Sequence, residues 1–536
     1  CISTHTCDNG IFYINIELCR LAGGGAMRAY RLFDGVPHSI LAGDLDLEVT
    51  DLVQDSRQVT PGAVFVCRAG TVTDGHNYID DAMNRGAAGI ILTDDLELPG
   101  MYNTLQHIFV AKMDDYRRSI GRLCNNFWDH PSRHLTVIAV TGTKGKTTTS
   151  YMIKNMLERG GCRTGLIGTI EICDGVNTFP SVNTTPDTLY LHRKLADMVR
   201  HGAKYCVMEV SSQGLMCSRI SGMDIDIAIY TNLSPDHIGA NEHRTFEEYC
   251  RWKRKLFSEC RYAVINADDI YSGMFGQTAE ETGARLVRYG VKNGDAVCGR
   301  RVHISKCGGA LGVGCDIFFP DGEIMPVNIQ APGKYNVFNA LAAASVGYIL
   351  GIPRESMALA LEQTKVRGRM ESVPVSDEFM VYIDYAHNAV SLLSVLMTLR
   401  KYDPHRILCV YGCGGGRSRN RRMGMGRVSG EYAEMTIITS DNPRMEDPEA
   451  IMDDIEAGVM ESSGRYVRIT DRKEAIRYAL TNAERGDIVL LAGKGHETYQ
   501  EVLGEKRHMD ERELIQQILE EEDAGNICGC DNRHIP

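Results

Sequence analysis

The chain has 536 residues, which at roughly 150 residues per domain predicts three or four domains. Hydrophobic residues make up 43% and charged residues 24%, a balance that is typical of folded globular proteins and excludes intrinsic disorder and collagen-like repeats. With 58 basic and 70 acidic side chains the formal net charge is −12, which disfavours a general nucleic-acid or membrane-surface binder. The 18 cysteines include no CxxC pair, so we expect reduced thiols in a cytoplasmic protein.

Alternating strand-like and helix-like segments divide the chain into three α/β blocks, over residues 27–133, 134–366 and 367–522. Such alternation predicts mostly parallel sheets with helices on both faces. Residues 1–26 lack a signal-peptide pattern and are expected to be an extension outside the fold, and residues 523–536 are interpreted as a disordered tail. The predicted strands, in chain order, are 63–67, 89–92, 135–140, 205–210, 225–231, 263–266, 380–384, 406–411, 435–439 and 488–492. Helices are predicted up to residue 159 and over 336–350.

The strongest single signal is a glycine- and threonine-rich loop between a predicted buried strand and a predicted helix. Backbone N–H groups of such a loop, together with the positive end of the helix dipole, bind phosphates. Lys146 is placed to reach the outer phosphates and Thr147 to bind Mg²⁺, although Val140 stands where the usual pattern has its first glycine. The loop residues are Gly142, Thr143, Lys144, Gly145, Lys146, Thr147 and Thr148. The sequence therefore predicts nucleotide binding.

Two further predicted strands lead to polar residues that suit a phosphate and metal site. Glu209 lies at the carboxyl end of the strand over 205–210, and His237 follows the strand over 225–231. A lone histidine is more often structural, but a position beside a phosphate loop favours a functional role. Lys253 lies on a predicted helix rich in cations, and its residue type alone favours a solvated basic face.

These motifs resemble the Mur ligase family in order and spacing, over roughly residues 27–515. The matching segments are Gly142–Thr148, Glu209–Ser212, Asn232–His237, Lys253–Phe257, Pro332-Gly333 with Asn336 and Asn339-Ala340, and Asp384–His387. The resemblance implies an N-terminal UDP-binding α/β domain, a central phosphate-loop ATPase domain with a mostly parallel sheet, and a C-terminal Rossmann-like domain. It also implies an ATP-driven amide synthesis, in which a substrate carboxylate forms an acyl phosphate that an incoming amine then attacks.

The resemblance also implies roles for single residues around ATP. Lys146, Glu209, His237 and Lys253 would be catalytic. Thr147, Glu209, His237 and Lys253 would bind Mg²⁺, the lysine as a carbamate, which converts a cation into an anion. ATP would contact the loop 142–148 and, from the C-terminal side, Asn336, Arg369, Asp384 and His387. Mg²⁺ and ATP are thus the expected cofactor and co-substrate, and both suit a reaction that brings two anions together.

Two groups of residues match the family's binding segments for the UDP-linked muramoyl peptide. By themselves, polar residues of this kind are usually only turn residues. Cys217 stands where relatives commonly carry glutamine, which predicts the loss of one polar contact. The residues are Ser56, Thr71, Val72 and Thr73 in the first block, and Asn183, Thr184, Thr185, Ser211, Cys217 and Arg219 in the second.

The most informative specificity element is Asp441-Asn442-Pro443-Arg444, which follows the strand over 435–439. An arginine on a rigid Asn-Pro turn suits a bidentate grip on a carboxylate, although an exposed arginine on an ordinary turn is the structural alternative. In the family this motif accompanies diaminopimelate, which has one carboxylate more than lysine. The resemblance adds Gly493 and Glu497 at the far end of the amino acid, and Arg422 as a further carboxylate contact.

We therefore expect a cytoplasmic, monomeric ligase that adds meso-diaminopimelate to UDP-MurNAc-L-Ala-D-Glu in peptidoglycan precursor synthesis, without a nucleic-acid or membrane partner. A lysine-adding ligase of the same family is the nearest alternative, which Arg444 disfavours; Gly416 and Ser418, where relatives carry aspartate, leave it open. A folylpolyglutamate synthase is a second alternative, which residues 27–133 disfavour because that enzyme lacks the N-terminal UDP domain. A non-catalytic nucleotide-binding partner subunit is disfavoured by the intact Lys146 and Glu209.

Overall fold

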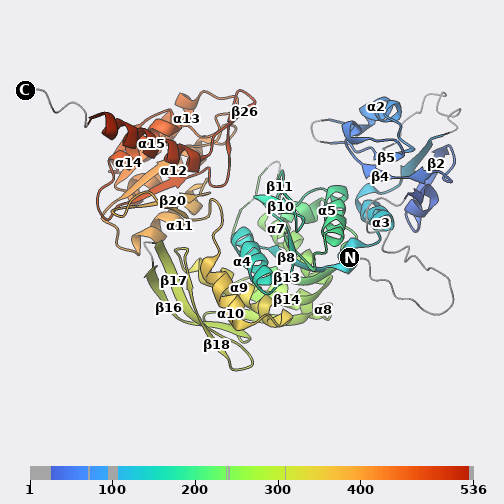
Figure 1. Ribbon diagram of the computed structural model, residues 1–536, viewed down its shortest axis with the longest axis horizontal. Helices are drawn as coiled ribbons and strands as arrows, with labels where there is room; N and C mark the ends of the chain where they lie inside the picture. The colour runs from blue at the N-terminus through green and yellow to red at the C-terminus, as the bar shows by residue number, and fades with distance from the viewer. Residues whose placement is uncertain are drawn as a thin grey trace, which may run out of the picture. The chain divides into compact units, whose positions relative to one another are not determined.

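The structure is a computed structural model that describes residues 26–70, 73–94, 107–236, 238–239, 242–307 and 310–529, with side chains up to 522 (Figure 1). It divides into two compact units. The first comprises Cys1–Lys146, Gly160–Ile265 and Asp269–Val287, and the second Thr147–Arg159, Asn266–Asp268 and Arg288–Pro536.

The first unit begins with a five-stranded sheet, drawn in blue in Figure 1. Its order is β2 (His38–Ala42), β7 (Phe109–Met113), β6 (Gly89–Leu92), β5 (Ala63–Val66) and β4 (Asp51–Val53), and only β2 runs antiparallel to its neighbour. Strands β5 and β6 are buried along their whole length, because alternate residues enter two different cores. The remaining elements are β1 (Met27–Arg28), β3 (Glu48–Val49), α2 (Ile79–Asn84) and α3 (Tyr116–Trp128).

The rest of the first unit contains most of the central parallel strands, although Asn266 and residues 288–290, at the ends of two of them, fall in the second unit. Its strands follow in the order β11 (Thr178–Pro180), β10 (Glu171–Cys173), β9 (Thr164–Ile167), β12 (Tyr205–Glu209), β8 (Thr136–Thr141), β13 (Ile225–Tyr230), β14 (Cys260–Asn266) and β15 (Arg285–Gly290). The strands from β9 to β14 run parallel, so their carboxyl ends share one edge, and β10 and β11 are antiparallel additions. The helices are α5 (Thr188–Arg200), α6 (Ser212–Met216), α7 (Phe246–Arg254) and α8 (Ser272–Glu281).

The second unit contains an antiparallel ribbon and a second parallel sheet. The ribbon comprises β16 (Val297–Cys307), β17 (Ala310–Phe318) and β18 (Ile324–Ile329), with α9 (Tyr335–Leu350) and α10 (Arg354–Gln363) following. The sheet has the order β19 (Glu371–Val373), β20 (Met380–Asp384), β24 (Ile488–Ala492), β21 (Ile407–Tyr411), β22 (Met435–Ile438) and β23 (Tyr466–Arg468). All of its strands but β19 run parallel.

Helices and a hairpin complete the second unit, and its sheet has a separate apolar core on each face. These elements are α4 (Lys146–Arg159, of which Lys146 falls in the first unit), α11 (Ala389–Arg400), α12 (Arg419–Tyr432), α13 (Pro448–Met460), α14 (Arg472–Thr481), α15 (Glu511–Gly529), β25 (Tyr499–Val502) and β26 (Glu505–His508). The predicted α/β fold with mostly parallel sheets is confirmed. Helix α15 reaches Gly529, so residues 523–529 of the predicted disordered tail are helical; the predicted domain bounds stay predictions.

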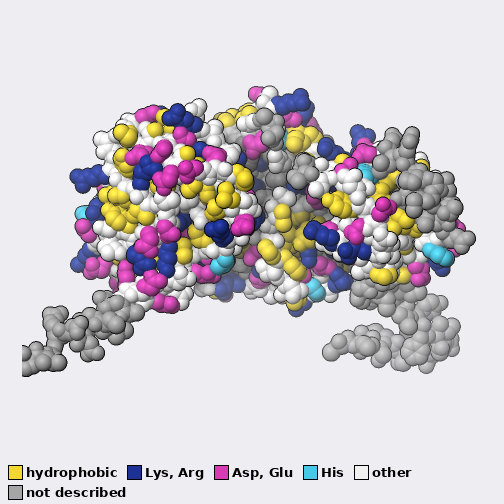
Figure 2. All heavy atoms as spheres, turned by 90° about the horizontal axis from the view of Figure 1, so that it is seen from above, with side chains coloured by type: hydrophobic (Ala, Val, Ile, Leu, Met, Phe, Trp, Pro, Cys, Tyr) yellow, Lys and Arg dark blue, Asp and Glu magenta, His cyan; other side chains and the backbone are white. Residues whose placement is uncertain are grey.

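The described surface carries both signs of charge. On the face drawn in Figure 2, basic and acidic side chains are interspersed with neutral and hydrophobic ones. On this face, such mixing differs from the extended basic surface of a nucleic-acid binder. Among the described residues, every helix is too short or too polar to cross a membrane.

Candidate active site

The phosphate loop joins β8 to α4, as its sequence predicts, and the residues after β13 hold it in place. Lys144 N donates to Asn232 Oδ1 (3.0 Å), and the Asn232 amide donates back to Lys144 O (2.9 Å). Gly142 has a φ of 146°, and a Cβ on it would overlap the Thr231 hydroxyl, so only glycine fits. Thr143 Oγ1 lies 3.0 Å from the Tyr249 hydroxyl. The loop backbone is thus fixed by side chains distant in sequence.

Two lysines meet at one carbonyl oxygen of this loop. Lys146 Nζ donates to Gly142 O (2.9 Å) and Thr143 O (3.1 Å), and Lys253 Nζ donates to Gly142 O (2.9 Å). Lys253 is only 2% exposed and its Nζ lies 4.7 Å from the centre of the Tyr249 ring. Burial, with the nearby Lys146 charge, holds the pKa of Lys253 well below its usual range. Two basic groups beside a phosphate loop suit a polyanionic ligand.

The solvated-face interpretation of Lys253 is wrong. Tyr249, Cys250 and Lys253 form the buried side of α7, while Arg251 and Lys255, which follows the helix, are exposed. The cations of this segment therefore divide between two faces, and position on the helix, not residue type, decides which of them reaches the phosphate loop.

Glu209 is the last residue of β12, which pairs with β8, the strand that leads into the phosphate loop. Its carboxylate is fully buried, and it accepts the Thr169 backbone N–H at Oε1 (2.8 Å) and the Thr169 hydroxyl at Oε2 (3.0 Å). The register pairs Glu209 with Val140 of β8, directly before the loop. A buried carboxylate at this edge has the oxygen chemistry that Mg²⁺ prefers. Thr147 is buried in the first turn of α4, and His237 lies outside the described residues.

Some of the residues predicted to bind the muramoyl peptide lie beside Glu209. The full set, named the muramoyl-peptide segment, comprises Asn183–Thr185, Ser211, Cys217 and Arg219. Thr185 Oγ1 donates to Glu209 O (3.0 Å) and accepts from Ser211 N (3.0 Å), and Arg219 Nη1 donates to Thr185 O (2.7 Å). The Thr184 hydroxyl is 3.1 Å from that of Thr169, which connects this segment to the Glu209 carboxylate. The structure therefore brings most of the predicted residues of the second block together. Asn183 is exposed and Cys217 half-buried.

The predicted uridine contacts lie in the N-terminal sheet region. Ser56 is buried in a short 3-10 helix after β4, and Thr73 is exposed, with its carbonyl accepting from Gly70 N (3.0 Å). Thr71 and Val72 lie outside the described residues. An ion pair between Arg68 and Asp187 connects this region to the muramoyl-peptide segment (2.9 Å).

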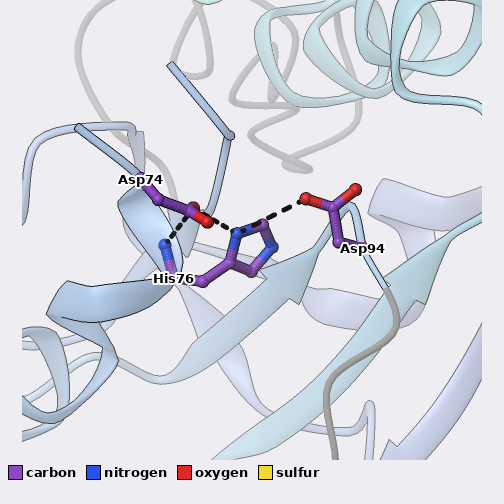
Figure 3. A group of neighbouring side chains, drawn as sticks. All are labelled: Asp74, His76 and Asp94. Atoms are coloured by element: carbon purple, nitrogen blue, oxygen red, sulfur yellow. Dashed lines mark hydrogen bonds and ion pairs between the residues drawn. The ribbon is translucent and has the colours of Figure 1, made fainter. Parts of the chain in front are cut away.

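One histidine nearby stands between two carboxylates (Figure 3). His76 Nδ1 lies 2.6 Å from Asp74 Oδ1 and 3.8 Å from Asp94 Oδ2, a grouping that resembles a metal site. However, Thr93 N donates to His76 Nε2 (3.2 Å), so the ring proton is on Nδ1 and points to Asp74. Both ring nitrogens are used. The cluster is therefore a local brace, which also lowers the pKa of Asp74 through the hydrogen bonds from the His76 backbone and ring.

The predicted ATP contacts of the second unit fall into two groups. Asn336 of α9 accepts from Asn339 Nδ2 (3.0 Å), and Asn339 Oδ1 accepts from Thr149 of α4 (3.3 Å). In the second group, the Arg369 guanidinium lies 4.9 Å from the centre of the Tyr385 ring, and Asp384 Oδ2 accepts from Met370 N (2.8 Å). His387, exposed before α11, donates from Nδ1 to Tyr385 O (2.8 Å).

The loops after β22 and β24 meet at one edge of the C-terminal sheet. Asn442 Nδ2 donates to Glu497 Oε2 (2.9 Å), which joins the Asp441–Arg444 turn to the Gly493–Glu497 loop. Arg444 has a φ of 56°, and its N donates to Glu501 O of β25 (2.9 Å). Its Nη1 donates to Gly415 O (2.8 Å) and its Nε lies 3.5 Å from Glu501 Oε2. The Arg444 side chain is 40% exposed, so an incoming carboxylate would not have to displace buried contacts to reach it.

Lys494 is a residue of this region for which sequence reasoning found no role. It is fully buried, and its Nζ donates to Asn442 Oδ1 (2.9 Å), Glu497 Oε2 (2.8 Å) and Tyr499 O (2.5 Å). Burial raises the pKa of Glu497, but the Lys494 charge and hydrogen bonds outweigh it, so the pKa is lowered. The available sequence signal was a lysine between two glycines directly after a buried strand.

Arg422 is placed differently from its prediction as a substrate contact. Its side chain is 5% exposed, and its guanidinium binds both oxygens of Glu446 (2.8 and 2.9 Å) and Asp454 (3.2 Å). Because two carboxylates of the chain already surround this arginine, it braces α12 against α13 and the preceding loop. A direct role in binding the amino acid stays a prediction.

The fold and these motifs define a nucleotide-binding α/β protein with a separate C-terminal sheet, and comparisons identify its class. Residues 48–120 match the Mur ligase family catalytic domain, 140–347 the Mur ligase middle domain, and 368–495 the Mur ligase glutamate ligase domain. The chain is 39% identical over 498 residues to the UDP-N-acetylmuramoyl-L-alanyl-D-glutamate–2,6-diaminopimelate ligase of Caldanaerobacter subterraneus subsp. tengcongensis, covering 92% of this chain and 99% of that one. The chain therefore belongs to the Mur ligase family.

Solved structures agree on the fold. A UDP-N-acetylmuramoyl-L-alanyl-D-glutamate–2,6-diaminopimelate ligase superposes with a TM-score of 0.62 and 30% identity, covering 89% of this chain and 96% of that one. A folylpolyglutamate synthase from Mycobacterium tuberculosis superposes with a TM-score of 0.55 over 69% of this chain and 91% of its own length. At 16% identity, the second comparison concerns the fold alone.

Proposed function

We propose that this chain joins meso-2,6-diaminopimelate to UDP-MurNAc-L-Ala-D-Glu with ATP as energy source, in peptidoglycan precursor synthesis. The observation that carries the assignment is the near full-length similarity to a ligase of that name, at 39% identity. The geometry of the C-terminal sheet supports it. An arginine and an ionised carboxylate, Arg444 and Glu497, flank Asn442 in one network, which suits an amino acid with an additional ammonium and carboxylate.

The reaction requires two anions to approach each other. A carboxylate oxygen of the peptide attacks the γ-phosphorus of ATP, the bond to the ADP oxygen breaks, and an acyl phosphate forms. The amine of diaminopimelate then attacks the acyl carbon, phosphate leaves, and the amine loses a proton. Lys146 and the N–H groups of residues 142–148 would stabilise the phosphate charge. Without such cations the repulsion between the carboxylate and the nucleotide would oppose the first step.

We assign magnesium binding to Thr147, Glu209, His237 and carbamoylated Lys253. The buried Glu209 carboxylate at the edge of the sheet supports this assignment, because hard oxygen donors are the preferred ligands of Mg²⁺. When bound, Mg²⁺ supplies positive charge that lowers the repulsion between the nucleotide and the attacking carboxylate. The residues of the chain would position that charge beside the phosphate loop.

The surroundings of Lys253 support its carbamoylation. Carbamoylation requires a neutral amine, whose nitrogen bonds to the carbon of CO₂ and then releases a proton. Burial and the neighbouring Lys146 favour the neutral form, since they lower the pKa of Lys253. The carbamate would place a negative charge beside the Lys146 ammonium, where the neutral Lys253 amine carries none.

The remaining predicted residues form the other substrate contacts of this proposal. Ser56, Thr71–Thr73, Thr184, Thr185, Ser211 and Arg219 would hold the UDP-linked peptide, and Asn336, Arg369, Asp384 and His387 would hold ATP. We expect a monomer, because the residues proposed for every substrate come from one chain. We also expect a cytoplasmic enzyme, because ATP and UDP-linked sugars are cytoplasmic metabolites.

The test is phosphate release from ATP with UDP-MurNAc-L-Ala-D-Glu and, in separate reactions, meso-diaminopimelate, L-lysine or L-ornithine. Release that depends on diaminopimelate is the expected result. A preference for lysine or ornithine would keep the ligase chemistry but contradict the role of Arg444, and would direct attention to Gly416 and Ser418. Absence of release with all three amines would contradict the assignment.

A further inference from the structure

The Lys494 side chain is fully buried, and each N–H group of its ammonium donates to an acceptor of the protein. An ammonium group has three N–H donors, and its partners here are Asn442 Oδ1, Glu497 Oε2 and Tyr499 O. They belong to the loop after β22, to its own loop after β24, and to β25. One side chain therefore ties together three backbone segments around the proposed amino-acid pocket.

These contacts fix the direction of the Asn442 amide. Asn442 Oδ1 accepts from Lys494 Nζ (2.9 Å) and from Glu501 N (2.9 Å), so both of its lone pairs are used. A flipped amide would point its NH₂ group at an ammonium and at a backbone N–H. Asn442 must therefore direct Nδ2 towards Glu497. Without Lys494, one of the two contacts that determine this orientation is lost.

The same lysine determines the charge of Glu497. Glu497 Oε2 accepts from Lys494 Nζ (2.8 Å) and Asn442 Nδ2 (2.9 Å), whereas Oε1 has only a long contact with the Tyr385 hydroxyl (3.4 Å) among the described side chains. Asp441, His496, Arg369 and Tyr499 are the other titratable or charged groups around this site. Among the charged groups of the described residues around this site, Lys494 is the one that donates directly to the carboxylate.

We propose that Lys494 is a positioning residue for the amino-acid substrate: it orients Asn442 and keeps Glu497 ionised, with one carboxylate oxygen left to receive the substrate's ammonium group. This inference rests on the proposed ligase function and extends it to a residue that does not touch the substrate. A neutral Glu497 would attract the substrate's ammonium group only weakly. A buried ion pair loses most of its attraction when one of its two partners becomes uncharged.

The test compares Lys494→Met and Lys494→Arg with the wild-type chain, measuring the KM for the amino acid, the KM for ATP and kcat between pH 5.5 and 8.5. For Lys494→Met we expect the KM for the amino acid to rise about 10- to 100-fold at neutral pH, the usual effect of losing a charge-assisted hydrogen bond, while the KM for ATP stays nearly constant. The loss of the Lys494 charge raises the pKa of Glu497. As the pH is lowered, the variant should therefore lose binding of the amino acid at a higher pH than wild type does.

The arginine variant separates charge from geometry. It keeps the positive charge, so the acid limb of the pH profile should remain near its wild-type position, while the changed donor geometry still raises the KM for the amino acid. If Lys494→Met does not fold, a wild-type KM in a folded Lys494→Arg would overturn the positioning role. Lys506→Met is the matched control. The exposed Lys506 lies 4.3 Å from the centre of the Tyr499 ring, which Lys494 Nζ also approaches (5.2 Å), but it is outside the network. Its loss should therefore change neither KM.

Two outcomes would overturn the inference in a folded Lys494→Met variant. One is an equal rise of both KM values, which would indicate general damage to the domain. The other is an acid limb at its wild-type position, which would mean that Lys494 does not set the charge of Glu497. A wild-type preference for lysine or ornithine would contradict the proposed diaminopimelate specificity but not the role of Lys494. The KM values of the variants are then compared for the preferred amino acid, which still tests Lys494.

Discussion

Burial gives two lysines of this chain opposite properties. Lys494 is surrounded by acceptors that include the Glu497 carboxylate, so its charge is balanced. Lys253 Nζ donates to one carbonyl among the described residues, and burial together with the Lys146 charge strongly lowers its pKa, although Asp236 opposes this. The first environment supplies three hydrogen-bond acceptors to an amine, and the second suits a neutral amine that can react with CO₂.

We predict that Lys253→Ala lowers ligase activity by roughly 10²-fold or more, because the site then lacks the proposed carbamate that holds Mg²⁺. Wild type depleted of CO₂ should lose activity and regain it with bicarbonate. Lys253→Glu, which supplies a permanent carboxylate, should retain more activity than Lys253→Ala. The measurement is phosphate release at saturating substrates; full turnover in Lys253→Ala would remove the carbamate from the mechanism.

We predict that Arg444→Ala raises the KM for diaminopimelate by about 10- to 100-fold and leaves the KM for ATP within a factor of two, since a bound carboxylate would lose a charge-assisted partner. The KM for L-lysine, which lacks that carboxylate, should hardly change. Steady-state kinetics with both amino acids provides the comparison. Equal effects on diaminopimelate and ATP would place Arg444 outside the amino-acid pocket.

At the scale of secondary-structure elements, a buried ion pair links the ends of β22 and β24, whose loops form the proposed amino-acid pocket. Arg472, at the start of α14, donates to Ser440 O after β22 (3.4 Å) and to Ala492 O at the end of β24 (3.0 Å). Its Nε binds Glu511 Oε1 of α15 (2.9 Å), and both side chains are 1% exposed. The arginine therefore keeps the two strand ends together behind the pocket.

We predict that Glu511→Leu lowers the unfolding free energy by about 3–5 kcal/mol, because it leaves the Arg472 charge buried and unpaired. The double variant Arg472→Met with Glu511→Leu should cost clearly less than the sum of the single changes, since it removes both charges. Urea unfolding of all four proteins measures this coupling. Additive effects would show that the two side chains stabilise the fold independently.

In the whole molecule, buried neutral histidines oppose folding at acid pH. Burial lowers the pKa of His192 to about 4 and, with the Arg369 charge, that of His496 to about 4. Between pH 6.5 and 4 the unfolded chain therefore binds more protons than the folded one. The stability that these groups allow at neutral pH is consequently lost as the pH falls through this window.

We predict that His192→Gln flattens the pH dependence of stability between pH 6.5 and 4 by about one proton, a difference on the order of 3 kcal/mol at the acid end. Glutamine can still donate to Ser221 O, which the His192 ring contacts at 2.9 Å, so stability at pH 7.5 should change little. Urea unfolding at several pH values gives the slope. An unchanged slope would mean that His192 is not the group that titrates.

The predicted strands over 380–384 and 488–492 coincide with β20 and β24, and the phosphate loop lies between β8 and α4. These features depend on neighbours in sequence: apolar runs, turn residues and helix starts act over a few positions. For the same reason the motifs with fixed local spacing, such as Asp441–Arg444, were recognisable without any structure.

The amino-acid sequence by itself therefore determined the order of elements, the nucleotide loop and the family. Only the tertiary structure decided that Lys253 is buried, that Lys494 connects Asn442 to Glu497, that Arg422 is held by two acids, and that both ring nitrogens of His76 are used. Each of these depends on residues brought together by the strand order, which no local pattern specifies. The charge and hydrogen-bonding capacity of a side chain are then determined by the partners that it meets in the folded chain.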